Sequence, residues 1–201
     1  MAPPQSYLDF STPRFSRYVN LTYPTRVWHA EFSYYGANVY AYLLSLHGES
    51  IDFVSIQLYE SYSRAAYDTF QLGVKPSSYL TRLIADHVGR GESFFVHFSD
   101  DAETGLTSRN VQLPVSSKLV IGLANGWARP DKVVYFSPYD IEQTLSDLRN
   151  AGLPVPRGFM FWAIDLEGEN GIYLAEGLQK AMEDRTNGNR NDGQVGSESA
   201  L

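Results

Sequence analysis

Three short apolar runs along the chain predict buried parallel strands. They are IDFVSIQLYE at 51–60, KLVIGLANGW at 118–127 and GFMFWAID at 158–165, and each leads into a polar or glycine-containing loop. Runs of this kind are typical of strands that are covered on both faces of a sheet. The segments between them are too long for hairpins and long enough for crossover helices, which is the connection that parallel strands require.

Segments with the periodicity of helices alternate with these runs, at 34–47, 78–88, 137–152 and 171–184. The first places Val39, Leu43 and Leu46 on one face, and Gly48 is expected to end it in a left-handed conformation. The alternation of helices with buried strands predicts an α/β fold with a parallel sheet.

The segment 137–152 carries the clearest helix signals. Ser137 can cap the first turn, Pro138 suits its first position, and Asp140 favours the positive end of the helix. Gly152 is expected to end the helix.

Two segments depart from the alternation. The residues 92–114 contain FFVHF and RNVQL around a polar turn, which predicts a small β-hairpin insertion. From 185 to 201 the chain is polar and rich in glycine and asparagine, which predicts a disordered tail. The expected folded unit is therefore 1–184.

Composition narrows the classes of partner. The chain has 201 residues, a net charge of −7 and no cysteine, and 14% of its residues are aromatic. An acidic chain without a basic cluster argues against nucleic acid, and the lack of cysteine excludes disulfides and thiolate metal sites. The aromatic excess suits a carbohydrate or peptide groove, and equally a β-rich core with tyrosines at its rim.

Membrane, cofactor and metal signals are weak. No apolar run reaches the roughly 18 to 20 residues of a membrane span, and the chain shows no signal peptide, so extracellular localisation is expected only if the complete protein is secreted. The acidic residues of 165–176 fit a calcium loop poorly, and a solvated loop before a helix explains them better. No cofactor or metal is expected.

Polar and aromatic side chains at the ends of the runs are the candidate site residues. Trp162 lies where the last strand meets its loop, which suits either a stacking floor for a sugar ring or a core tryptophan packed against helices. Gln57 and Tyr59 alternate onto one face of the first strand. They could contact a polar ligand, or they could form a closed internal hydrogen-bond network.

In combination and in order, these runs resemble the second half of a glycoside hydrolase family 18 domain, the (β/α)8 barrel of chitinases and chitinase-like proteins. MAP at the start of the chain resembles the end of the family's fifth strand. IDFVSIQLYE, KLVIGLANGW and GFMFWAID resemble the sixth, seventh and eighth strands, the last of which carries a hallmark tryptophan. The resemblance implies strands five to eight of a TIM barrel over 1–184, with the hairpin as an insertion.

The same resemblance implies roles for four residues. Tyr59 would hydrogen-bond the acetamido group of the sugar, Gln57 would line the same pocket, and Trp162 would form the floor beneath the ring. Glu60 stands where the family often has Asn or Asp. In the family, a glutamate protonates the glycosidic oxygen and the substrate's own N-acetyl group attacks the anomeric carbon.

That glutamate closes a D-x-x-D-x-D-x-E motif on the family's fourth strand, and no such motif occurs in this chain. No catalytic residue is therefore expected here. The simplest expectation is that Met1 is an internal methionine of a longer barrel. The alternative is a true half-barrel that covers its exposed edges with a second copy.

These observations lead to two functional hypotheses. The first is a partial chitinase-like domain that binds chitin or oligosaccharides of β-1,4-linked N-acetylglucosamine, with hydrolysis only when the N-terminal half supplies the acid. The second is a non-catalytic carbohydrate-binding or assembly module that dimerises as a half-barrel. Neither hypothesis involves nucleic acid or a membrane span.

Overall fold

The computed structural model describes residues 5–9, 12–17, 37–61, 63–89, 93–112, 118–129 and 131–188. Two predictions fall outside these ranges: the resemblance of MAP at 1–3 to a strand end, and the part of the predicted tail from 189 to 201.

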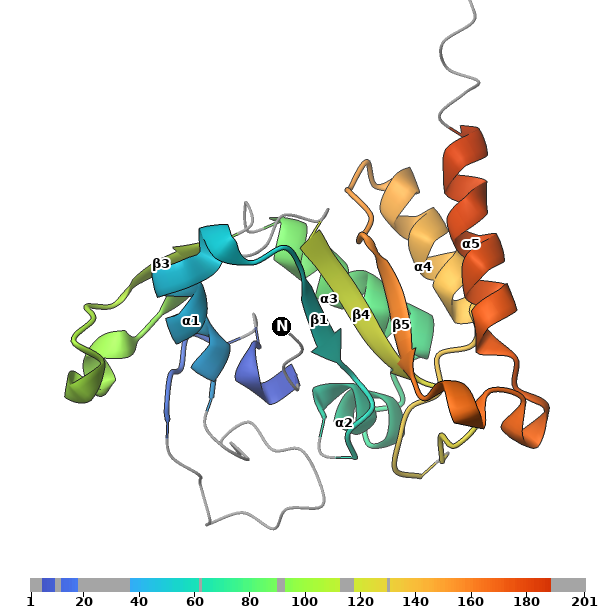
Figure 1. Cartoon of the computed structure of the whole chain (residues 1–201), viewed down its shortest axis with the longest axis horizontal. Coiled ribbons are helices and arrows are strands. Elements are labelled where there is room, and N and C mark those ends of the chain that lie inside the picture. The colour runs from blue at the N-terminus through green and yellow to red at the C-terminus, as the bar shows by residue number, and fades with distance from the viewer. Residues whose placement is uncertain are drawn as a thin grey trace, which may run out of the picture.

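A parallel sheet of three strands stands at the centre of the described fold (Figure 1). Strands β1 (Val54–Gln57), β4 (Leu119–Ala124) and β5 (Gly158–Trp162) lie in the order β1-β4-β5. They confirm the three strands predicted from the apolar runs. Each strand is shorter than its run, because the residues that follow leave the sheet to form a loop.

The four predicted helical segments are confirmed by α1 (Val39–His47), α3 (Pro76–Gly89), α4 (Pro138–Asn150) and α5 (Leu174–Gly188). Helix α5 continues to Gly188, past the predicted start of the tail at 185. A further helix, α2 (Arg64–Phe70), was not predicted, because its 7 residues are too few to establish a periodicity. Among the described residues, no helix is long and apolar enough to cross a membrane.

The start and end of α4 agree with the signals in its sequence. The Ser137 hydroxyl accepts a hydrogen bond from the Asp140 backbone N–H at 3.2 Å, and the Asp140 carboxylate accepts one from the Ser137 N–H at 3.0 Å. Together these bonds form a capping box, with Pro138 at the first helical position. Gly152 follows the helix with a φ of +67°, the left-handed region that favours glycine.

Helix α1 differs from its prediction in two respects. Gly48 is not left-handed: its φ is −55°, and it begins a short 3-10 turn that ends at Ser50. The buried residues are Ala41 and Leu44, whereas Leu43 and Leu46 are exposed. The reason is that α1 contacts strand β3 (Arg109–Gln112) and the 3-10 turn Gln5–Tyr7, so these neighbours decide which face is covered.

The predicted β-hairpin is present in the structure. Strands β2 (Ser93–Val96) and β3 (Arg109–Gln112) pair antiparallel, with Phe94 opposite Val111. The hairpin lies beside α1 and away from the three-stranded sheet (Figure 1). An N-terminal segment, residues 12–17, is attached to it, because the His97 N–H donates to the Pro13 carbonyl at 2.9 Å.

The two faces of the three-stranded sheet differ in character. One face carries Val54, Ile56, Leu119, Ile121 and Leu123, all fully buried in the hydrophobic core. Helices α3, α4 and α5 cover this face, and each contacts the next (Figure 1). Strands and covering helices therefore follow one another in chain order, which confirms the α/β class.

Alternation along the strands places a second set of side chains on the opposite face, which we call the second face. Its members are Ser55, Gln57, Val120, Gly122, Ala124, Gly158, Met160 and Trp162. The candidate site lies where the second face meets the C-terminal ends of the strands.

Candidate functional site

Three aromatic side chains, which we call the aromatic row, lie at the C-terminal ends of the parallel strands. The Tyr59 ring meets the Trp127 ring edge-to-face, with centroids 6.2 Å apart and 76° between the ring planes. The indole N–H of Trp127 donates a hydrogen bond to the backbone carbonyl of Trp162, the third member. The row therefore joins the ends of β1, β4 and β5, at the edge where ligands bind in parallel α/β folds.

Trp162 ends β5, and its side chain faces solvent. The residue is 57% exposed, so the alternative of a core tryptophan packed against helices is wrong. The preceding residue, Phe161, instead packs against the hydrophobic core beneath the helix layer. The peptide bond between Trp162 and Ala163 is cis. The position and exposure of the indole make its surface accessible to a ligand at this edge.

Tyr59 lies over the second face of the sheet. A Cβ atom on Gly122 would come within 3.3 Å of the Tyr59 ring and 3.0 Å of the Met160 sulfur. Only glycine therefore lets both side chains approach β4 so closely. Gln57 pairs with Gly122 in the strand register and lies half-buried on the same face. The predicted sharing of one face by Gln57 and Tyr59 is confirmed.

The Tyr59 hydroxyl is a stable proton donor. Partial burial, and secondarily the neighbouring charge of Glu60, raise the pKa of Tyr59 to about 12. The phenol therefore keeps its proton throughout the neutral range and can donate a hydrogen bond to an acceptor such as a carbonyl oxygen.

Glu60 follows Tyr59 and has a largely buried carboxyl group. Burial raises the pKa of Glu60 to about 7, and a backbone hydrogen bond opposes the shift. Its Oε2 atom is buried and has no hydrogen-bond partner among the described residues. A carboxyl with this pKa is partly protonated near neutral pH, so it can donate as well as accept a hydrogen bond.

Glu60→Gln is expected to stabilise the protein above pH 7 and to change its stability little below about pH 4. The carboxyl has a pKa of about 7 in the folded state and 4.5 as its ordinary value, so the folded state binds more protons between these values. Stability of the native protein therefore falls as pH rises through this window, by on the order of 3 kcal/mol. The amide cannot lose a proton and avoids the loss.

Urea unfolding of both proteins across the same pH range measures this difference. Asp131→Asn is the control, because that residue is exposed. The difference in stability between Asp131→Asn and the native protein is expected to stay constant over this pH range. Parallel stability curves for the native protein and Glu60→Gln would contradict the buried titrating carboxyl.

Asn125 connects the loop after β4 to the loop after β5. Its buried side-chain amide donates to the Ala163 carbonyl at 2.9 Å and to the Glu167 carboxylate at 3.1 Å. The second oxygen of Glu167 accepts from the Ala175 N–H, in the first turn of α5, at 2.6 Å.

Among the described residues, no group of three or more His, Asp or Glu side chains could hold a metal ion. The acidic loop 165–176 thus contributes Glu167 to the connection between the loops.

Gly126→Ala is expected to loosen the same connection and to lower stability by about 1 to 3 kcal/mol. An added Cβ would lie 2.9 Å from the Glu169 Cβ and 3.0 Å from its carbonyl carbon, so backbone would have to move. That movement would also strain the hydrogen bond from the Asn170 side chain to the Gly126 carbonyl, now 2.8 Å long.

Thermal unfolding measures the effect of this substitution. Gly158→Ala is the matched control, because nothing lies within 4 Å of a Cβ added there. Equal melting temperatures for Gly126→Ala and Gly158→Ala would contradict the close contact between the two loops.

A hollow of about 420 Å³, which we call the aromatic-row hollow, borders the aromatic row. It is lined by Tyr59, Ser61, Trp127, Arg129, Lys132 and Val133. Small-molecule sites commonly enclose roughly 300 to 1,000 Å³. The combination of aromatic edges with hydrogen-bond donors suits a polar ring, such as a sugar.

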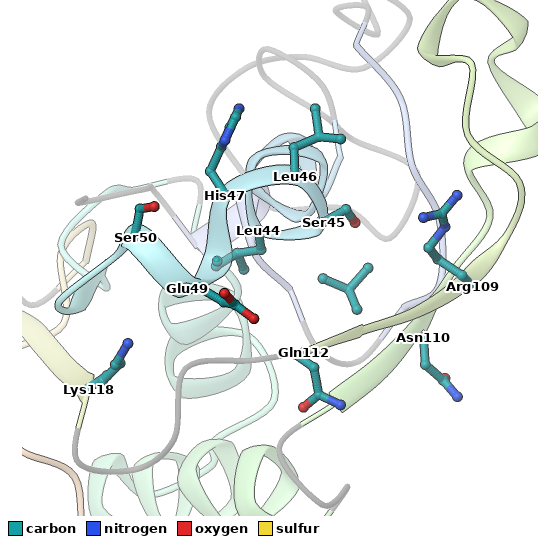
Figure 2. A pocket seen from close by; sticks show the side chains of 12 residues that line it. Leu44, Ser45, Leu46, His47, Glu49, Ser50, Arg109, Asn110, Gln112 and Lys118 are labelled. Carbon is teal, nitrogen blue, oxygen red and sulfur yellow. The ribbon is translucent and has the colours of Figure 1, made fainter.

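A larger hollow, of about 620 Å³, lies between α1 and β3 (Figure 2). Arg109 and Lys118 stand at its opposite ends, and the Lys118 ammonium donates to the Ile51 carbonyl at 2.8 Å. This hollow borders the residues that precede β1 and β4, which is the N-terminal edge of the sheet. Because ligand sites in parallel α/β folds lie at the opposite edge, we assign the candidate site to the aromatic row.

Comparison of the chain with protein-family models, curated proteins and solved structures finds no match. The resemblance to glycoside hydrolase family 18 therefore rests on the strand motifs. Of the predicted site residues, Gln57, Tyr59 and Trp162 lie on or at the end of the second face, and Glu60 is largely buried beside Tyr59. Trp127 was not predicted as a site residue, although its place at the end of the run 118–127 was a usable signal.

Proposed function

We propose that this chain is the sugar-binding part of a chitinase-like barrel and binds oligosaccharides of β-1,4-linked N-acetylglucosamine. The observation that carries the proposal is the exposed Trp162 indole at the C-terminal end of β5, in one row with Trp127 and Tyr59. Exposed aromatic side chains at this edge of a parallel sheet are suited to the apolar faces of sugar rings.

The arrangement of the sheet supports the barrel part of the proposal. Strands β1, β4 and β5 follow chain order, and α3, α4 and α5 form one layer on one face. A doubly wound sheet would place helices on both faces, whereas a (β/α)8 barrel places them all outside. The second face, with Gln57 and Met160, would then be the barrel interior.

The chemistry of the site supports the choice of an N-acetylated sugar. Tyr59 keeps its proton in the neutral range and would donate to the acetamide carbonyl oxygen. Gln57 offers both an amide donor and an acceptor on the same face. The Trp162 indole would lie against the ring. Bond cleavage would need a proton donor from a D-x-x-D-x-D-x-E motif on another segment, so this chain binds without cleaving.

Isothermal titration of the chain with chitotetraose tests the proposal, and cellotetraose is the matched ligand. The two tetrasaccharides share the β-1,4 linkage and differ in the acetamido group. We expect saturable binding of chitotetraose and at least tenfold weaker binding of cellotetraose, because the contact to Tyr59 is lost. Equal affinities, or no binding of either, would overturn it.

The second functional candidate is a non-catalytic module that assembles as a half-barrel. One observation favours it: among the described strands, β1 and β5 each pair with β4 alone, so each keeps one edge. Light scattering of the purified chain distinguishes the two. A stable dimer that binds chitotetraose supports the module. Chitinase activity that appears only on mixing with a fragment carrying the acidic motif supports the partial enzyme.

A further inference from the structure

We infer that the aromatic-row hollow takes an acidic group on the saccharide, a carboxylate or a sulfate, held by Arg129 and Lys132. The inference rests on the proposed function and names the substrate class of the same site. It goes beyond the neutral polymer that the strand motifs indicate.

A tight turn brings the two basic side chains to one hollow. The backbone N–H groups of Lys132 and Val133 both donate to the Arg129 carbonyl, at 3.0 and 2.9 Å. Val133 is buried and lines the hollow, whereas Arg129 and Lys132 are exposed at its rim. The turn is therefore anchored, and both cations border the same space as Tyr59 and Trp127.

The charges of Arg129 and Lys132 are not used within the described part of the protein. Among the described residues, neither side chain forms an ion pair, whereas Arg17, Arg64 and Arg82 each lie against an aspartate. Asp131, between them in the sequence, lines a neighbouring hollow with Tyr67 and Gln71, and Lys132 borders that hollow as well. Within the described residues, these two cations lie at one rim without an ion-pair partner, although the chain as a whole is acidic, with a net charge of −7.

The chemistry of these groups favours an anion attached to a ring. A guanidinium presents parallel N–H donors that match the oxygens of a carboxylate or sulfate, and an ammonium adds a second positive charge. The adjacent edges of Tyr59 and Trp127 give the ring an apolar surface. A neutral sugar would use the aromatic surface and leave both cations without a counter-charge.

Titration of the full chain with three tetrasaccharides tests the inference: chitotetraose, 6-O-sulfated chitotetraose and a hyaluronan tetrasaccharide, which carries carboxylates. We expect at least one acidic ligand to bind roughly tenfold more tightly than chitotetraose, with an advantage that shrinks as salt is added. The tighter of the two identifies sulfate or carboxylate. Equal affinities for all three ligands would overturn the inference, as would equally tight binding of inorganic sulfate.

The double variant Arg129→Gln/Lys132→Gln is expected to lose the preference for acidic ligands, so that they bind no more tightly to it than chitotetraose does. Arg149→Gln/Lys180→Gln is the matched control, because it removes the same charge from exposed positions on α4 and α5. A preference that survives in the first variant, or disappears equally in both, would overturn the inference. If the native chain binds none of the three saccharides, the proposed function is overturned instead.

Discussion

Replacing Trp162 with alanine is expected to abolish measurable binding of chitotetraose without unfolding the protein. The side chain is 57% exposed, so its removal leaves no cavity in the core. The carbonyl that accepts the hydrogen bond from Trp127 belongs to the backbone and is retained. Loss of an aromatic contact at the centre of a site costs about 2 to 4 kcal/mol, roughly 30-fold to 1,000-fold in affinity.

The measurement is a calorimetric titration of each variant, with circular dichroism to establish that it is folded. Phe95→Ala is the control, because Phe95 is 45% exposed on β2 of the hairpin, apart from the aromatic row. We expect that control to bind as the native protein does. Native affinity in a folded Trp162→Ala variant would exclude the indole from the site.

Asn38→Ala is expected to lower the free energy of unfolding by about 3 to 5 kcal/mol. The side chain is 0% exposed, and its Oδ1 accepts from the Asp9 N–H at 2.7 Å. Its amide donates to the carbonyls of Thr12 and Arg14 at 2.9 and 2.8 Å. Alanine would remove the three hydrogen bonds that Asn38 makes to this backbone, at about 1 to 1.5 kcal/mol each, and would add strain at the left-handed φ of +50°.

Urea unfolding of native and variant proteins measures this loss. Asn150→Ala, at the exposed end of α4, is the control and is expected to change stability by less than about 0.5 kcal/mol. A loss below 1 kcal/mol for Asn38→Ala would mean that the segment before α1 is held by other contacts. We expect instead that hydrogen exchange of the Asp9 amide becomes faster in step with the loss of stability.

Local signals in the sequence identified most elements of the fold. Ser137 caps α4 in the structure as predicted, because a cap is formed within one turn of chain, and Asp140, predicted only to favour the positive end of the helix, completes the capping box. The apolar runs predicted the strands for a related reason, since a strand that is buried on both faces requires continuous apolar character. Helix α2 was not predicted, because a helix of 7 residues shows little periodicity and depends on its packing against α3.

The sequence also predicted Tyr59 and Trp162, two of the three residues that form the aromatic row. Gln57 and Tyr59 could be placed on one face because side chains alternate strictly along a strand. The exposure of Trp162 could not be derived in this way, because an apolar residue at a strand end is compatible with both core and surface. Tyr59 lies next to Trp127, Arg129 and Lys132 only because two loops that follow different strands come together.

The sequence by itself determined the α/β class, the strands, most of the helices and the hairpin, because each follows from a pattern of apolar and polar residues within one segment of the chain. Tertiary structure alone decided which face of α1 is buried, that Glu60 has a buried carboxyl, and that Asn125 ties the loops after β4 and β5 together. These features depend on contacts between segments distant in sequence, where burial and hydrogen-bond partners are set by packing rather than by local pattern.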